Sequence, residues 1–209
     1  EYDWKTLYSD SLTTVKAALS FEKKVTFEGN TASELNAFLK NCSQVVVEFT
    51  ADKIALDEII RVPSDVILQG NGAQLLAPAQ VTGVASEEVK YAMLLEDVQN
   101  VGIYDFRILS GCGQGVYVIG SHNCLIWNNE IANVTYKALC VMGDNTYVNL
   151  VNNSVHDNGN GAIFLNGEIT NCIIQGNEVY QNRGTRNLTA GIVLSSMEVE
   201  DPYTPYNVF

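Results

Sequence analysis

Hydrophobic and polar positions repeat along the second half of the chain with a spacing of 23 or 24 residues. Three apolar columns follow this spacing, and two of them are separated by two residues, which is strand periodicity with both columns on one face. Internal repetition of this kind indicates stacked supersecondary units. The columns are Val101, Cys124, Val148 and Cys172; Ile103, Ile126, Leu150 and Ile174; and Ile108, Ile131, Val155 and Val179.

Each repeat contains several short apolar runs separated by Gly, Asn and Asp. The runs are too short for helices, and their spacing leaves no room for helical crossovers between parallel strands. Coiling is the remaining way to bury one face of every run against its neighbours. The sequence therefore predicts an all-β fold, a right-handed parallel β-helix with about 24 residues per rung, over residues 45–197.

One polar column is as regular as the apolar ones. Asn129, Asn153 and Asn177 are separated by 24 and 24 residues, and Phe106 takes the corresponding place in the first rung. An asparagine in a tight bend accepts left-handed geometry, and its amide can bond to the asparagine of the next rung. We interpret this column as a structural ladder.

The region before the repeats indicates a cap. Residues 31–42 read as a helix with a capping box, in which Thr31 is the N-cap and Glu34 follows three residues later. Residues 12–21 are a second helix candidate. We assign residues 1–44 to a helical cap, which a solenoid needs over its open apolar end. Residues 198–209 are a C-terminal tail, for which we expect either a solenoid that continues further or a closure of its open end by the last nine residues.

The charge of the chain limits its partners. Twelve Lys and Arg against 24 Asp and Glu give a net charge of −12, and no basic cluster stands out in the sequence. Nucleic acid and anionic membranes are therefore disfavoured as partners. No apolar run approaches 18 residues, so membrane insertion is not predicted. The sequence leaves the oligomeric state open.

The five cysteines cannot all pair within one chain, and none has a CxxC spacing. The favoured interpretation is that they are small buried hydrophobic residues, with one disulfide or a reactive thiol as alternatives.

The order of these segments resembles a known group. A helix, VVVEF at 45–49, IIRVPSDVILQGNGAQLL at 59–76 and the repeated asparagine rungs are similar to the pectate-lyase-like superfamily of right-handed β-helix proteins, over residues 31–197. The resemblance implies an extracellular or cell-surface protein that acts on a polysaccharide or glycan. The DPHD motif of alginate epimerases and the NTD, DD, GHG and RIK series of polygalacturonases are missing, which disfavours those subfamilies.

The resemblance also implies a substrate groove along the strands written GVYV, ALCV, GAIF and GIVL, with loops 109–114, 132–137, 156–160 and 180–190 as its wall. A base that removes a proton or activates water, beside a cation that stabilises negative charge, would support β-elimination or hydrolysis. The alternative is a structural His-Asp turn pair with solvated arginines. The catalytic candidates are Lys137, His156, Asp157, Arg183 and Arg186.

Two observations bear on this site. The outward positions of the groove strands, Tyr117, Cys140, Ile163 or Phe164, and Val193, are largely apolar, which counts against catalysis there. A carboxylate pair for a glycosidase would have to combine Asp157 with Asp144 or Glu168, and the same three residues are the possible Ca²⁺ ligands. The spacing of these residues along the sequence requires neither the carboxylate pair nor the Ca²⁺ site.

Aromatic residues are the substrate-binding candidates, namely Tyr104, Tyr117 and Trp127. Tyr104 and Trp127 occupy one outward column, where they either stack against sugar rings or lie beneath a loop or a partner subunit; we favour the second.

The sequence thus leads to an extracellular carbohydrate-active β-helix of the polysaccharide lyase or glycoside hydrolase type. The alternative is a non-catalytic carbohydrate-binding, scaffold or adhesin module. A third possibility is the N-terminal part of a longer β-helix whose chemistry lies further along.

Overall fold

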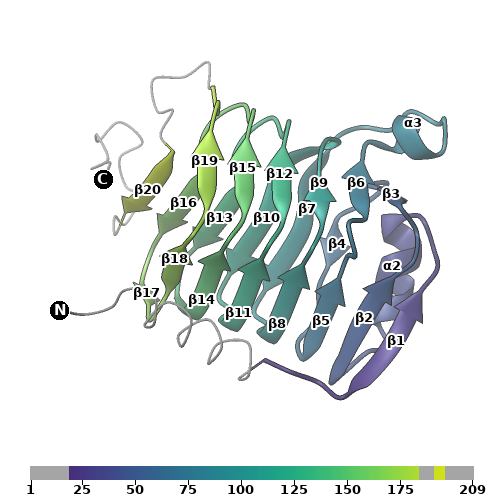
Figure 1. Cartoon of the computed structure of the whole chain (residues 1–209), viewed down its shortest axis with the longest axis horizontal. Coiled ribbons are helices and arrows are strands. Elements are labelled where there is room, and N and C mark those ends of the chain that lie inside the picture. Colours follow the sequence, from purple (N-terminus) through teal and green to yellow (C-terminus); the bar gives the residue numbers. More distant parts are fainter. Residues whose placement is uncertain (1–18, 184–190, 196–209) are drawn as a thin grey trace.

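The computed structural model describes residues 19–183 and 191–195, and these form a right-handed parallel β-helix built from three sheets (Figure 1). The chain visits sheets A, B and C in turn, and each strand pairs in parallel with its counterpart in the next rung. Sheet A contains β1 (Lys23–Phe27), β2 (Val45–Phe49), β5 (Val66–Gln69), β8 (Gln99–Tyr104), β11 (His122–Trp127) and β14 (Asn145–Val151), which pairs with both β17 (Ile169–Thr170) and β18 (Ile173–Gln175). Sheet B contains β3 (Lys53–Ala55), β6 (Gln74–Leu76), β9 (Arg107–Ile108), β12 (Glu130–Ala132), β15 (Ser154–His156) and β19 (Glu178–Tyr180). Sheet C contains β4 (Ile60–Arg61), β7 (Val89–Glu96), β10 (Cys112–Ile119), β13 (Leu139–Met142), β16 (Ile163–Asn166) and β20 (Ile192–Ser195).

The strand register confirms the predicted apolar columns. Ile103 pairs with Ile126, Ile126 with Leu150, and Leu150 with Ile174. The column that contains Ile108 is aligned in the same way in sheet B. Like residues therefore lie on like in one continuous core, which buries the inner face of all three sheets.

Left-handed residues turn the chain at each corner of the coil. One corner column, between sheets A and B, has positive φ at Asn71, Asp105, Asn128 and Asn152, and another, between sheets B and C, has it at Asn133, Asp157 and Gln181. Asn and Asp tolerate this conformation better than other side-chain-bearing residues. The Asn and Asp residues between the apolar runs thus form the bends that let the strands coil.

The predicted asparagine ladder is present, and its members Asn129 and Asn153 are buried. The Oδ1 of Asn153 accepts hydrogen bonds from the backbone N–H and the side-chain amide of Asn129, at 3.0 and 3.1 Å. Asn177 accepts from Asn153 in the same way, and the backbone N–H of Phe106 donates to Asn129 at the start of the ladder. A second ladder, which the sequence analysis missed, joins Val134, Asn158 and Asn182 at the corner between sheets B and C.

The N-terminal cap combines a strand and a helix. α2 (Ala32–Leu39) has the predicted capping box between Thr31 and Glu34 and buries Leu35 and Leu39 against the first rungs. β1 precedes α2 and pairs with β2, so sheet A begins at Lys23, ahead of the expected boundary at residue 45. Most of the helix predicted over residues 12–21 lies outside the described residues, and 19–21 are not helical. The second short helix, α3 (Pro78–Val81), leads out of sheet B.

All five cysteines are free. Cys112, Cys124 and Cys140 are buried, and burial raises the pKa of their thiols to about 12, 12 and 11. These values disfavour the reactive-thiol alternative for the three buried cysteines, because the thiolate is the nucleophile.

Candidate functional site

A groove of about 590 Å³ lies at the N-terminal end of sheet C. Its lining comes from three elements that are distant in sequence: α2, the segment around β4, and the start of β7. The contributing residues are Asn36, Leu39 and Lys40; Glu58, Ile59, Arg61 and Pro63; and Val89 and Lys90.

Positive charge is concentrated around this groove. Lys40, Arg61 and Lys90 are exposed on its lining, and Glu58 is the carboxylate among the lining residues. Glu96 lies beside it, with one oxygen 3.8 Å from Arg61. With Glu58 on the lining and Glu96 beside Arg61, the three cations leave this groove with a small local excess of positive charge in a chain of net charge −12.

Aromatic residues continue from the groove across sheet C. The Nζ of Lys90 lies 5.0 Å from the centre of the Tyr91 ring, and a hydrogen bond to Tyr91 raises the pKa of the lysine. The Tyr91 and Tyr117 rings stack with centroids 4.4 Å apart. Burial is the main cause that raises the pKa of Tyr117 to about 12. Both rings are half-buried, so a bound molecule can reach them.

Lys137 lies further along the same side of the molecule, in the turn before β13. Its Nζ is 3.2 Å from the centre of the Phe164 ring and 5.2 Å from that of Tyr136. Desolvation lowers the pKa of Lys137. The two aromatic faces favour the ammonium and oppose this effect. Lys137 is therefore a poorly hydrated cation that gives up its proton more readily than an exposed lysine.

The outward-facing side chains of sheet C are more buried than those of a substrate groove would be. The strand register aligns Tyr117, Cys140, Phe164 and Val193, so Phe164, rather than Ile163, occupies the outward position. Cys140, Phe164 and Val193 are buried and pack on one another, whereas Tyr117 is half-buried at their edge. The part of the face that is open to a ligand is thus the basic groove, Tyr91 and Tyr117, with the half-buried Lys137 beyond them.

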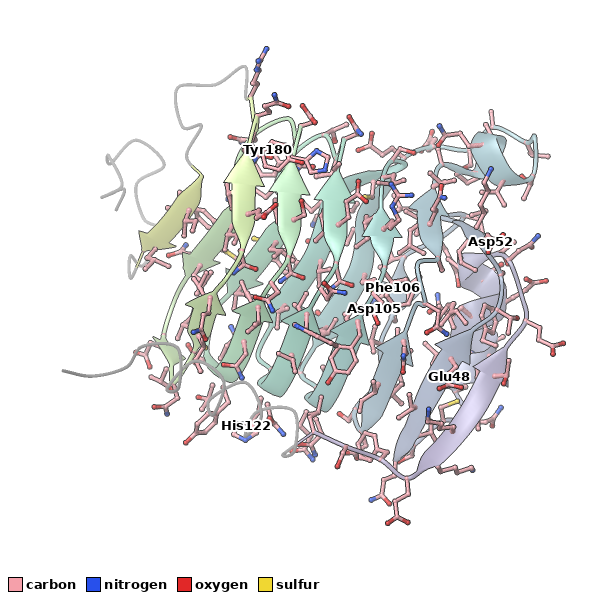
Figure 2. All side chains as sticks on the ribbon, in the orientation of Figure 1. Glu48, Asp52, Asp105, Phe106, His122 and Tyr180 are labelled. Atoms are coloured by element: carbon pink, nitrogen blue, oxygen red, sulfur yellow. The ribbon has the colours of Figure 1, made fainter. Side chains whose placement is uncertain are left out.

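His156 and Asp157 belong to a second polar cluster, on the outer face of sheet B. The Nδ1 of His156 lies 2.8 Å from an Asp157 oxygen, and its Nε2 lies 3.5 Å from Glu130, which receives a 2.6 Å hydrogen bond from Arg107. That hydrogen bond is the main cause that lowers the pKa of Glu130. Tyr180, on β19 (Figure 2), stacks on His156 with ring centroids 4.7 Å apart.

The predicted catalytic residues are thus divided between two clusters. Lys137 contacts Tyr136 and Phe164, whereas His156 and Asp157 are engaged with Glu130 and Tyr180. Arg183 is exposed beyond β19, where its backbone N–H donates to Asn158, and Arg186 lies outside the described residues. The geometry supports a His-Asp turn pair rather than one five-residue site.

The predicted carboxylate pairs do not assemble either. Asp144 and Glu168 line a small pocket of about 280 Å³ at the corner between sheets C and A. Asp157 lies at the corner between sheets B and C, where it contacts His156. Among residues 19–183 and 191–195, no three His, Cys, Asp or Glu side chains are grouped so that they could hold a metal ion.

Tyr104 and Trp127 lie on the outer face of sheet A, whereas the groove and Lys137 lie at sheet C. Their rings meet edge to face at 5.5 Å and pack against a cluster that contains Leu19 and Phe21. Burial raises the pKa of Tyr104, and its hydroxyl is buried without a hydrogen-bond partner. This environment supports the packing role that we favoured.

Sequence reasoning missed several residues of these clusters. Lys40, Arg61 and Lys90 are far apart in the chain and belong to non-repeating segments, so no column relates them. Glu130 and Tyr180 were detectable, because each occupies a sheet B position that the 24-residue spacing relates to its neighbours.

With this geometry established, comparisons with known proteins identify the family. A family model described as a right-handed beta helix region matches residues 91–208, more than half of the chain. The chain therefore belongs to the right-handed β-helix family. No curated protein and no solved structure matches it.

None of the helices in the described part of the chain has the length and apolar character to cross a bilayer.

Proposed function

We propose that this chain is an extracellular or cell-surface protein that binds an acidic polysaccharide across the N-terminal half of sheet C. The observation that carries the proposal is the alignment of the basic groove, which includes Lys90, with Tyr91 on β7 and Tyr117 on β10, the next strand of sheet C.

This surface suits an acidic sugar chain for two reasons. Lysine and arginine pair with carboxylate or sulfate groups, and the partly open tyrosine rings offer flat apolar faces to pyranose rings. β7 and β10, which carry the two tyrosines, each pair with a strand on both sides, so this platform is rigid before the ligand arrives and little ordering accompanies binding.

Polysaccharide cleavage by β-elimination is the second candidate, and Lys137 is the observation that favours it. Its lowered pKa suits a base that removes the proton next to a sugar carboxylate. The position of Lys137 over Phe164, beyond Tyr117 along sheet C, would place such a base at the far end of the same platform. Hydrolysis by paired carboxylates has less support, since the candidate carboxylates lie at different corners.

The test is a panel of acidic and neutral polysaccharides, incubated with the protein with and without Ca²⁺. Binding is measured by calorimetry, and products are detected through unsaturated uronides and new reducing ends. We expect binding of acidic chains, with Tyr117→Ala and Lys90→Ala each weakening it about tenfold. Lys53→Ala, on sheet B, is the control and should have no effect.

The outcomes separate the two candidates. Unsaturated product that disappears in Lys137→Ala, with binding retained, identifies a lyase. Binding without product identifies a binding module. If acidic chains do not bind, or if the sheet C variants bind as tightly as the parent, the proposal is wrong.

A further inference from the structure

Sheet C ends at a helix rather than at a strand. The sheet runs from β20 to β4, and in the rung before β4 the chain forms α2 between β1 and β2. α2 therefore occupies the place that a further sheet C strand would take. Asn36 and Leu39 of α2, together with Lys40 at its C-cap, line one side of the groove beside β4 and β7. The outer face of sheet C thus has a wall at its N-terminal end.

The wall is fixed in place. The side-chain amide of Asn36 donates to Glu58 and to the carbonyl of Ile59, both at 2.7 Å, and its oxygen accepts from the backbone N–H of Arg61 at 2.9 Å. These three bonds join the middle of α2 to β4 and to the two residues before it. The capping box at Thr31 holds the start of the same helix. α2 is consequently a static boundary rather than a mobile lid.

The basic groove lies directly against this wall. Lys40 follows the last turn of α2, Arg61 is on β4 and Lys90 is on β7, so the three cations come from the wall and from the two strands beside it. Glu58 accepts from Asn36, which uses part of its hydrogen-bonding capacity within the wall. Beyond the groove, Tyr91 and Tyr117 continue the path away from α2.

We propose that the groove is a terminal subsite: it takes the end of an acidic glycan, and the rest of the sugar chain runs over Tyr91 and Tyr117. This inference rests on the proposed function and specifies its ligand. A sugar chain that lies across the strands can leave the groove on the tyrosine side, whereas α2 blocks its continuation on the other side. The carboxylate of the terminal sugar lies among Lys40, Arg61 and Lys90.

The experiment uses the chain with size-fractionated oligouronates and the corresponding polymers, built from galacturonate, from mannuronate and guluronate, and from glucuronate-containing chains. Affinity is expressed per mole of sugar chain. For a terminal subsite, molar affinity reaches a plateau once the oligomer covers the tyrosines, and Lys40→Glu weakens it about tenfold. The matched control, Lys53→Glu, makes the same charge change on sheet B and leaves affinity unchanged.

Each alternative result has a distinct meaning. If molar affinity keeps rising with the length of the sugar chain, and Lys40→Glu binds normally while Tyr117→Ala does not, the protein binds internal stretches of the polysaccharide. The terminal subsite is then wrong and the proposed function stands. If none of these acidic chains binds, both are wrong. Circular dichroism melting of each variant shows that a loss of binding is not a loss of fold.

Discussion

The buried asparagines show how single side chains hold the coil together. Asn153 accepts two hydrogen bonds from Asn129, donates to Asn177, and donates to the carbonyl of Ile126 at 3.0 Å. Every one of these bonds joins neighbouring rungs. Because water is excluded here, a partner left without its bond incurs a full desolvation cost.

Asn153→Ala should therefore lower the free energy of unfolding by about 3 kcal/mol, since at least one buried N–H and one buried carbonyl would be left unpaired. Urea denaturation followed by circular dichroism measures the change. Ser154→Ala is the control, since that side chain is directed away from the core, and it should change stability by less than about 0.5 kcal/mol. Equal effects of the two substitutions would show that the hydrogen bonds of the asparagine ladder do not stabilise the fold.

Tyr147 is an exception among the residues with left-handed backbone geometry. Asp65, Asn100 and Asn123 precede it in a left-handed column, in which Asn123 donates to Asn100 and Asn100 donates to Asp65, both at 2.8 Å. Tyr147 has φ 57° and continues the column with a bulky ring, 48% exposed, that touches His122. A bulky residue in this conformation is strained.

Tyr147→Asn should raise the free energy of unfolding by about 1 kcal/mol, because it relieves the strain and offers an amide that can donate to Asn123. Thermal unfolding by calorimetry tests this expectation. Tyr147→Gly separates the two causes, since glycine relieves the strain without supplying an amide. A destabilised Tyr147→Asn variant would show that the contact with His122 outweighs the strain.

At the scale of single elements, the sequence predicted which strands pair better than it predicted where the helix lies relative to the strands. The strands of the repeats were predictable because spacing alone aligns Ile103 with Ile126 and Glu130 with Ser154. α2 was predictable as a helix from Thr31 and Glu34, but nothing in its own sequence shows that it lies beside β4. The candidate groove depends on that placement, so it could not be predicted.

Cross-strand pairs on sheet B give a pH dependence with a defined sign. The hydrogen bond from Arg107 lowers the pKa of Glu130 below its ordinary value of about 4.3, so the folded state binds fewer protons than the unfolded state near that pH. The resulting stabilisation is present above the ordinary pKa and is lost as pH falls through the lowered folded value.

Arg107→Met should consequently reduce stability at pH 7 by about 0.5 kcal/mol, and the difference from the parent should shrink as the pH falls below about 4. Urea titrations at a series of pH values measure it. Arg61→Met controls for the loss of an arginine from the surface. A difference that stays constant down to pH 3 would mean that Arg107 acts through packing alone.

At the scale of the whole molecule, stability depends on contacts between successive rungs. The hydrophobic core is continuous, but strands pair only with their counterparts in adjacent rungs. Such a molecule behaves as a one-dimensional array in which central units have two neighbours and terminal units have one. The fold class was predictable from the sequence for the same reason, because each rung repeats the interactions of the last.

Hydrogen exchange should reflect this arrangement. Backbone amides of β10 and β11, which have paired strands on both sides, should exchange most slowly, and those of β1 and β20 most rapidly. Mass spectrometry of peptic fragments after timed exchange gives the protection of each rung. Uniform protection from β1 to β20 would instead indicate a single cooperative unit.

The repeated corners also bear on how such a molecule can change in evolution. A tandem duplication of one 24-residue rung between β10 and β14 would place each corner asparagine opposite another of its kind and each core residue opposite another apolar one. The copy would extend every sheet by one strand, about 4.8 Å. α2 and the groove beside it would be unaltered, so the length of the coil and the chemistry of its closed end are free to diverge independently.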